Sequence, residues 1–154
     1  MTRRQLTHVA LVVKDLDASI DFYRRYAALE VVHERREPGG GRAAWMNDGQ
    51  AAFVLVLLAP GRWSLRAAVT RSIARIVDTS DHLGVACASR EEIVSLCRLA
   101  RSEGRLRKPP RDAGPVVGFY AMISDPDGHN LEVSHGQEVG LAVARARDAG
   151  PSRS

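Results

Sequence analysis

Apolar and polar positions along the first part of the chain follow the order strand, helix, strand, strand, strand. A β-branched apolar run at residues 7–13 predicts the first strand. Apolar residues then recur at helical spacing from Leu16 to Ala27, behind Asp15 and Asp17, either of which can cap a helix. Strand patterns follow at residues 29–34, 43–47 and 51–58, and glycine-containing turns separate them.

The same order recurs about 74 residues later, where His82 stands as His8 stands in the first series. Ser89 and Glu92 have the spacing of a capping box, and the helix that they begin ends at Gly104. Strands are predicted at residues 81–88, 105–108, 116–124 and 130–134, with the tight turn Asp-Pro-Asp-Gly at 125–128 joining the last two. This repetition predicts an α+β fold of two tandem βαβββ modules.

The domain organisation follows from the repeat. Residues 1–137 are interpreted as one domain, with modules at about 5–60 and 80–137 and a linker at 61–79. Apolar spacing in the linker predicts a short amphipathic helix over 65–76. Residues 138–154 form an Ala/Arg/Gly/Ser-rich C-terminal tail.

Strand parity selects three residues with metal-binding side chains. His8 and His82 each lie on the face of their strand that carries the smaller side chains, so that face can line an open concavity. Glu132 stands in an otherwise apolar strand, and a buried carboxylate needs a cation nearby. Two imidazoles and one carboxylate leave coordination positions open for a substrate. The alternative interpretation is that both histidines are hydrogen-bonded core residues.

The segments that carry these residues resemble the vicinal oxygen chelate superfamily. Residues 7–23 are similar to its opening strand and helix, residues 81–85 to the start of its second module, and residues 125–132 to its closing hairpin. The resemblance covers roughly residues 4–137 and implies a curved mixed-sheet cup built from the paired modules. It also implies that His8, His82 and Glu132 hold one divalent ion: Fe, Mn, Zn, Ni or Co.

Members of this superfamily include glyoxalase I, extradiol dioxygenases, fosfomycin-resistance thiol transferases, methylmalonyl-CoA epimerase and metal-free bleomycin-binding proteins. The fourth ligand, usually Glu in glyoxalase I, should fall near Val56, where the chain is apolar. The segment 114–124 lacks the further His of the dioxygenases, and Ala10 stands where the fosfomycin enzymes usually have Thr. The bleomycin-binding proteins lack the ligands that this chain keeps. The reaction type, lyase, isomerase or dioxygenase, therefore stays open.

Tyr120 is the further candidate for catalysis beside Glu132. It lies twelve residues before Glu132 across the predicted hairpin, and both share a face if the hairpin has no bulge. Its hydroxyl could hydrogen-bond to a substrate oxygen or protonate it, whereas the competing interpretation is a core aromatic residue. His129, beside the turn, is expected to be exposed to solvent, and His135, past the last strand, could reach the rim of the cup.

Composition and charge argue against other classes of function. The net charge is +4, but the basic residues are spread along the chain and aromatic residues make up 5%, so we expect no nucleic-acid partner. The longest apolar run, at 51–60, is about half the length that a membrane-spanning helix needs. The N-terminus shows no signal peptide, and Cys87 and Cys97 suit reduced buried thiols. We therefore expect a cytoplasmic protein with no membrane partner.

These observations predict a divalent-metal-dependent enzyme of the glyoxalase/dioxygenase superfamily, which chelates a small substrate through two neighbouring oxygens. The alternative is a metal-free small-molecule or antibiotic-binding protein of the bleomycin-resistance type. A third possibility is a structural or regulatory dimer with inert histidines. Since the cup of this fold is completed by pairing modules within or between chains, the resemblance also implies a homodimer.

Overall fold

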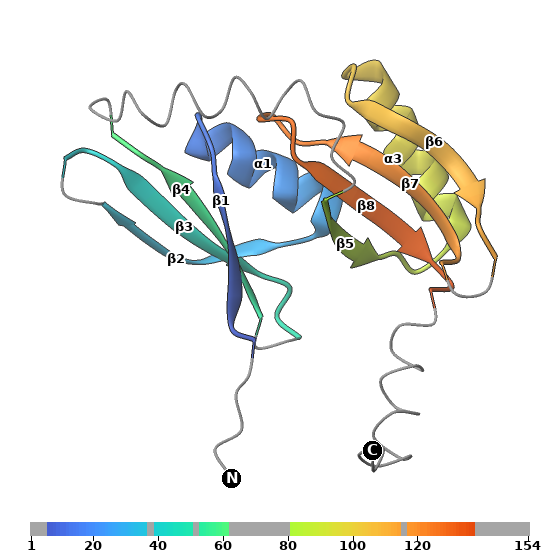
Figure 1. Cartoon of the computed structure of the whole chain (residues 1–154), viewed down its shortest axis with the longest axis horizontal. Coiled ribbons are helices and arrows are strands. Elements are labelled where there is room, and N and C mark those ends of the chain that lie inside the picture. The colour runs from blue at the N-terminus through green and yellow to red at the C-terminus, as the bar shows by residue number, and fades with distance from the viewer. Residues whose placement is uncertain (1–5, 37–38, 51–52, 62–80, 115–116, 138–154) are drawn as a thin grey trace, which may run out of the picture. The chain divides into compact units, whose positions relative to one another are not determined.

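The computed structural model describes residues 6–36, 39–50, 53–61, 81–114 and 117–137 (Figure 1). They belong to two compact units: Met1–Ser80 with Asp125–His129, and Asp81–Ser124 with Asn130–Ser154. The amphipathic helix predicted at 65–76 and the tail at 138–154 lie outside the described residues. In the described part of the chain, no helix is long and apolar enough to cross a membrane.

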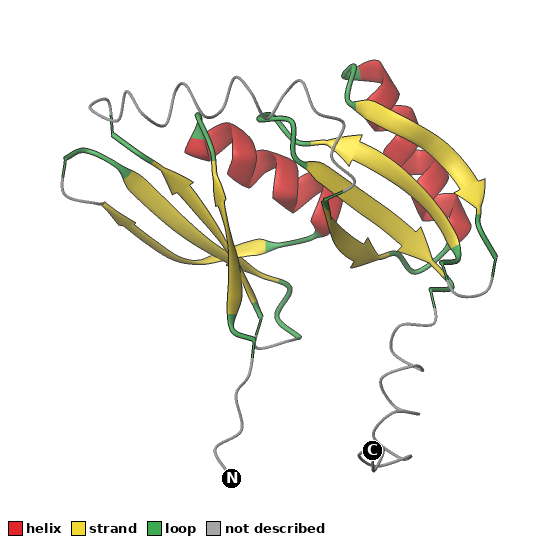
Figure 2. Ribbon diagram, viewed as in Figure 1, coloured by secondary structure: helices red, strands yellow, loops and turns green. Residues whose placement is uncertain are grey.

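The described residues of the first unit form a four-stranded mixed sheet and one helix (Figure 2). Its strands are ordered β1-β4-β3-β2; β1 and β4 are parallel, and the other pairs are antiparallel. The elements are β1 (His8–Val12), α1 (Leu16–Ala27), β2 (Glu30–Arg36), β3 (Arg42–Asn47) and β4 (Val54–Ala59).

Helix α1 begins and ends where local chemistry allows it. The Asp15 side chain accepts a hydrogen bond from the Ala18 backbone N–H at 3.1 Å, which satisfies one amide of the first turn. At the other end Ala28 has a left-handed backbone with φ 51°. Helix α1 packs against β2, β3 and β4, and its buried residues include Leu16, Ile20, Phe22, Tyr23 and Tyr26.

The second unit repeats the arrangement of the first. Its sheet is ordered β5-β8-β7-β6, with β5 and β8 parallel and the other pairs antiparallel. The elements are β5 (His82–Ala86), α3 (Arg90–Ser102), β6 (Leu106–Asp112), β7 (Phe119–Ser124) and β8 (Asn130–His135). The predicted tandem βαβββ order is therefore confirmed.

The predicted capping box begins α3. Ser89 Oγ accepts a hydrogen bond from the Glu92 backbone N–H at 3.2 Å, and the Glu92 carboxylate accepts one from the Ala88 N–H at 2.7 Å. The buried side of the helix carries Ile93, Cys97 and Ala100 against the sheet. Gly104, with φ +68°, follows the C-cap as expected.

Strand β6 differs from its prediction. It runs to Asp112, whereas the pattern indicated an end at Lys108. The next two residues are Pro109 and Pro110, which have no N–H to donate to a ladder and therefore suggest the end of a strand. Because β6 is the edge of its sheet, it can continue through both prolines, with register shifts relative to β7.

Candidate functional site

His82 and Glu132 approach each other on one face of the second sheet. The parallel pairing of β5 with β8 places Gly84 opposite Glu132 and His82 opposite Asn130. His82 Nε2 lies 3.5 Å from Glu132 Oε2. The Glu132 residue is 4% exposed, whereas the His82 side chain is 38% exposed. The pair is thus a buried carboxylate with an imidazole beside it that solvent can reach.

Room for a ligand lies beside this pair. A Cβ atom built on Gly84 would meet no atom within 4 Å, and Gly84 is the register partner of Glu132. The next residue of β5 on that face is Ala86, which is exposed. Small residues on β5 therefore leave open space at Gly84, the register partner of the buried carboxylate, as the parity of the sequence predicted.

Gln137 is the second polar partner of Glu132. Its Nε2 donates a hydrogen bond to Glu132 Oε1 at 3.1 Å, and its own Oε1 lies 3.4 Å from Ser134 Oγ. Strand parity does not point to Gln137, because it lies beyond the end of β8. The two oxygens of Glu132 thus face different partners, the Gln137 amide and the His82 imidazole.

His8 lies on β1, in the first unit, and is exposed. Its Nδ1 is 2.9 Å from Thr7 Oγ1. The pairing of β1 with β4 places Ala10 opposite Val56, as the pairing of β5 with β8 places Gly84 opposite Glu132. Val56 is therefore the repeat counterpart of Glu132, and the first unit has a buried apolar side chain where the second has a carboxylate.

The second unit brings together two of the three predicted ligands, His82 and Glu132. In the described ranges, no group of three or more His, Cys, Asp and Glu side chains lies close enough to hold a metal ion. The donor types themselves suit a divalent ion, because imidazole nitrogen and carboxylate oxygen are ligands of Fe, Mn, Zn, Ni and Co.

Tyr120 lies on the same face of the sheet as Glu132. Strands β7 and β8 pair without a register shift, so Met122 is opposite Glu132 and Tyr120 is opposite Ser134. The Tyr120 residue is 6% exposed, and its hydroxyl accepts a hydrogen bond from Arg111 Nε at 2.7 Å. No motif or parity pattern in the sequence pointed to Arg111.

His135 and His129 differ from the sequence-based expectations. His135 is the last residue of β8 and pairs with Phe119, on the face opposite to Glu132. Its Nδ1 lies 3.1 Å from the Cys87 carbonyl oxygen. His129 was expected to be exposed to solvent, but it is half-buried because its Nδ1 lies 2.8 Å from Asp125 Oδ2.

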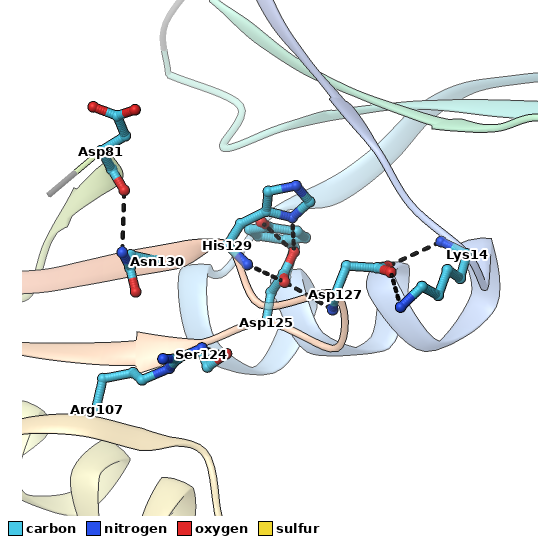
Figure 3. A network of polar contacts seen from close by, with 9 residues as sticks. Lys14, Asp81, Arg107, Ser124, Asp125, Asp127, His129 and Asn130 are labelled. Atoms are coloured by element: carbon cyan, nitrogen blue, oxygen red, sulfur yellow. Dashed lines mark hydrogen bonds and ion pairs between the residues drawn. The ribbon is translucent and has the colours of Figure 1, made fainter. Parts of the chain in front are cut away.

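The turn between β7 and β8 is a polar network (Figure 3). Asp125 Oδ1 accepts hydrogen bonds from the backbone N–H groups of Asp127 and His129, at 2.9 and 2.8 Å. Asp127 in turn accepts one from the Lys14 backbone N–H at 2.9 Å. Burial of the Asp125 carboxyl opposes its ionisation, but the His129 hydrogen bond and charge outweigh burial and lower its pKa. The same hydrogen bond raises the pKa of His129.

The two cysteines are reduced and weakly reactive. Burial raises the pKa of the Cys87 thiol to about 11 and also raises the pKa of Cys97. The thiolate is the nucleophile, so neither residue suits nucleophilic catalysis at neutral pH. Cys97 is buried, as the sequence indicated, whereas Cys87 is only half-buried.

Comparisons with known proteins agree with the fold. A family model described as Glyoxalase/Bleomycin resistance protein/Dioxygenase superfamily matches residues 5–133. An uncharacterized protein of Pseudomonas aeruginosa is 38% identical over 137 residues, which cover 88% of this chain and 91% of that protein.

Two further proteins are similar at lower identity. A lactoylglutathione lyase of Salmonella typhimurium is 24% identical over 143 residues, which cover 90% of this chain and 98% of the lyase. A solved structure of a mutant of the fosfomycin resistance protein FosX from Listeria monocytogenes, complexed with Mn(II) and a dihydroxypropylphosphonic acid, matches with a TM-score of 0.64. That match has 18% identity and covers 92% of this chain and 99% of the FosX chain.

Proposed function

Because the chain belongs to the Glyoxalase/Bleomycin resistance protein/Dioxygenase superfamily, we propose that it is a divalent-metal-dependent enzyme acting on a small substrate with two neighbouring oxygens. His8, His82 and Glu132 are the proposed ligands. The observation that carries the proposal is the buried Glu132 carboxylate with His82 Nε2 at 3.5 Å. A carboxylate in such a place is costly unless a cation or strong donors compensate its charge.

A divalent ion at this site would supply Lewis acidity to the two substrate oxygens. The protein contributes the orientation of the groups around it. Gln137 holds one oxygen of Glu132, which fixes the direction of the other. Tyr120 accepts a hydrogen bond from Arg111, so its own O–H can donate to a substrate oxygen on the face that it shares with Glu132.

The identity of the bound metal would narrow the choice among the possible reaction types. The superfamily has lactoylglutathione lyase members, to which this chain is similar at low identity. Iron in the purified protein would favour dioxygenase chemistry, and nickel, zinc, cobalt or manganese would favour lyase, isomerase or transferase chemistry.

We also propose that the protein is a homodimer, which light scattering at micromolar concentration tests directly. A monomer mass would contradict it.

The second candidate function is a metal-free protein that binds a small molecule or antibiotic. One observation favours it: Val56 is buried and apolar at the repeat counterpart of Glu132, so a fourth carboxylate ligand is missing. The two candidates make opposite predictions about bound metal.

Elemental analysis of protein purified without chelators tests the proposal. We expect about one divalent ion per chain in the wild type, and loss of that ion in His8→Ala and His82→Ala. His33→Ala is the matched control, because His33 is an exposed histidine of β2 whose ring contacts Trp45. Full metal content in His82→Ala would contradict the ligand assignment. A wild type without metal after incubation with divalent ions would favour the binding protein.

A further inference from the structure

A bulge in β6 turns Arg111 toward the face that carries Glu132. Lys108 pairs with Met122 and Arg111 pairs with Tyr120, so three steps along β6 correspond to two along β7. In a regular strand, residues 108 and 111 would point to opposite faces. The register shift between them places both on the face of Tyr120 and Met122, which is also the face of Glu132.

Tyr120 holds the Arg111 guanidinium in a defined position. Arg111 Nε donates to the Tyr120 hydroxyl at 2.7 Å, and Arg111 Cζ lies 5.0 Å from the centre of the Tyr120 ring. Among the described residues, no carboxylate pairs with Arg111. Its Nε is thus engaged, while the two terminal nitrogens of the fork remain available to a ligand.

The charge around Arg111 favours an anion. Lys108 lies on the same face, opposite Met122 and in the same row of the sheet as Glu132. Arg107 reaches this face through a hydrogen bond from its Nη2 to Ser124 Oγ at 3.4 Å. Three cationic residues of the edge strand β6 therefore flank this face. Among the described strand residues that share the face, Glu132 is the one with a carboxylate. Clustered charge of one sign attracts ligands of the opposite sign.

We propose that Arg111 binds an oxyanionic group of the substrate, and that Tyr120 positions the Arg111 guanidinium for this contact. The substrate is then a small anion, a carboxylate, phosphate or phosphonate, whose charged group lies toward β6. A guanidinium suits this role because its fork matches the paired oxygens of such groups. The inference rests on the proposed function, since it assigns the substrate class of that same site.

The test uses full-length, metal-free protein, so that no ion can hold the anion itself. Inorganic phosphate and acetate are titrated separately at constant ionic strength, and the arginine Nε–H signals are followed by NMR. We expect saturable binding of at least one anion with a shift of the Arg111 signal. Phosphate alone would assign a phosphate or phosphonate, acetate alone a carboxylate, and both the shared oxyanion chemistry. Binding of neither anion would overturn the proposal.

Variants separate a built site from general attraction to a basic protein. Arg111→Gln should weaken anion binding at least about tenfold, as expected for a charge-assisted contact. Tyr120→Phe should weaken it less, since it leaves the charge but removes the oxygen that holds Nε. Arg98→Gln is the matched control: it removes one charge from the exposed side of α3 and should change affinity less than twofold. Equal binding by Arg111→Gln and wild type would overturn the proposal.

Metal content of the same variants keeps this inference distinct from the proposed function. Arg111→Gln should retain the divalent ion of the wild type. If the wild type holds metal and Arg111→Gln binds anions as the wild type does, the metalloenzyme proposal is supported and the anion-site proposal is contradicted. Arg111-dependent anion binding in a protein that takes up no metal would do the reverse.

Discussion

The Tyr23 hydroxyl donates a hydrogen bond to Asp125 Oδ2 at 3.1 Å, across 102 positions of sequence. Tyr23 lies on α1, and Asp125 begins the turn between β7 and β8. Both residues are buried, and Asp125 also accepts hydrogen bonds from the backbone of its own turn. Burial and the nearby Asp125 carboxylate raise the pKa of Tyr23, so the phenol stays protonated and remains a donor.

Tyr23→Phe should therefore destabilise the protein by about 1–3 kcal/mol, because it removes a donor from a buried carboxylate. Urea unfolding at pH 7 measures the loss. Adding Asp125→Asn to Tyr23→Phe should cost less than the sum of the two single substitutions, since the residues share one contact. Strictly additive effects would show that the hydrogen bond contributes nothing.

The Asp125–His129 pair predicts a specific dependence of stability on pH. The pKa of His129 is raised above its ordinary value of 6.5, so its contribution is complete below pH 6.5 and is lost as pH rises through the folded-state pKa. The pKa of Asp125 is lowered below 3.8, so its contribution is complete above that value and is lost only at lower pH. The stabilisation by the pair is thus greatest between these two values.

We expect the difference in free energy of unfolding between wild type and His129→Gln to be larger at pH 5.5 than at pH 9. Urea unfolding at both values measures it. The same comparison in an Asp125→Asn background is the control, because the carboxylate that pairs with His129 is then absent and the dependence on pH should shrink. A His129→Gln effect that does not change with pH would contradict the assignment.

A side chain at Gly118 should be more destabilising than one at Gly104. Gly118 has φ +76°, and a Cβ atom there would lie 2.5 Å from the His135 carbonyl oxygen. Gly104 has a similar φ of +68° but open space around it. Gly104→Ala should therefore cost about 1–2 kcal/mol for the left-handed backbone alone. Gly118→Ala should cost more, and thermal unfolding compares the two. Equal losses would mean that the backbone near His135 relaxes freely.

Gln137 is expected to tune the proposed metal site without touching the ion. Because its amide holds one oxygen of Glu132, Gln137→Ala should weaken affinity for Mn(II) or Ni(II) by roughly 10- to 100-fold. Competition with a chelator of known affinity measures this. Gln50→Ala, in an exposed loop, is the control. Unchanged affinity in Gln137→Ala would exclude this role and leave the ligand assignment to its own test.

Much of the fold could be predicted because its signals are local. The Asp-Pro-Asp-Gly turn joins β7 and β8 without a register shift, which meets the condition under which parity predicted that Tyr120 shares a face with Glu132. The resemblance to the superfamily implied that a fourth ligand would fall near Val56, and the strand pairing makes Val56 the counterpart of Glu132 in the first unit. Alternation carries this information wherever a strand is regular.

The rest depends on contacts that alternation cannot carry. Parity fails at the β6 bulge, where a register shift moves Arg111 to the other face. It says nothing of Gln137, which reaches Glu132 from beyond the end of its strand. Nor does alternation indicate side-chain contacts within a turn, such as the one between His129 Nδ1 and Asp125 Oδ2.

The turn Asp125–His129 packs with the first unit, although the strands on either side of it belong to the second. Neither unit is therefore a continuous stretch of chain. The five residues of the turn would be missing from the first unit if the gene were divided at the linker. The first unit expressed alone would therefore lack the Tyr23–Asp125 and Lys14–Asp127 hydrogen bonds.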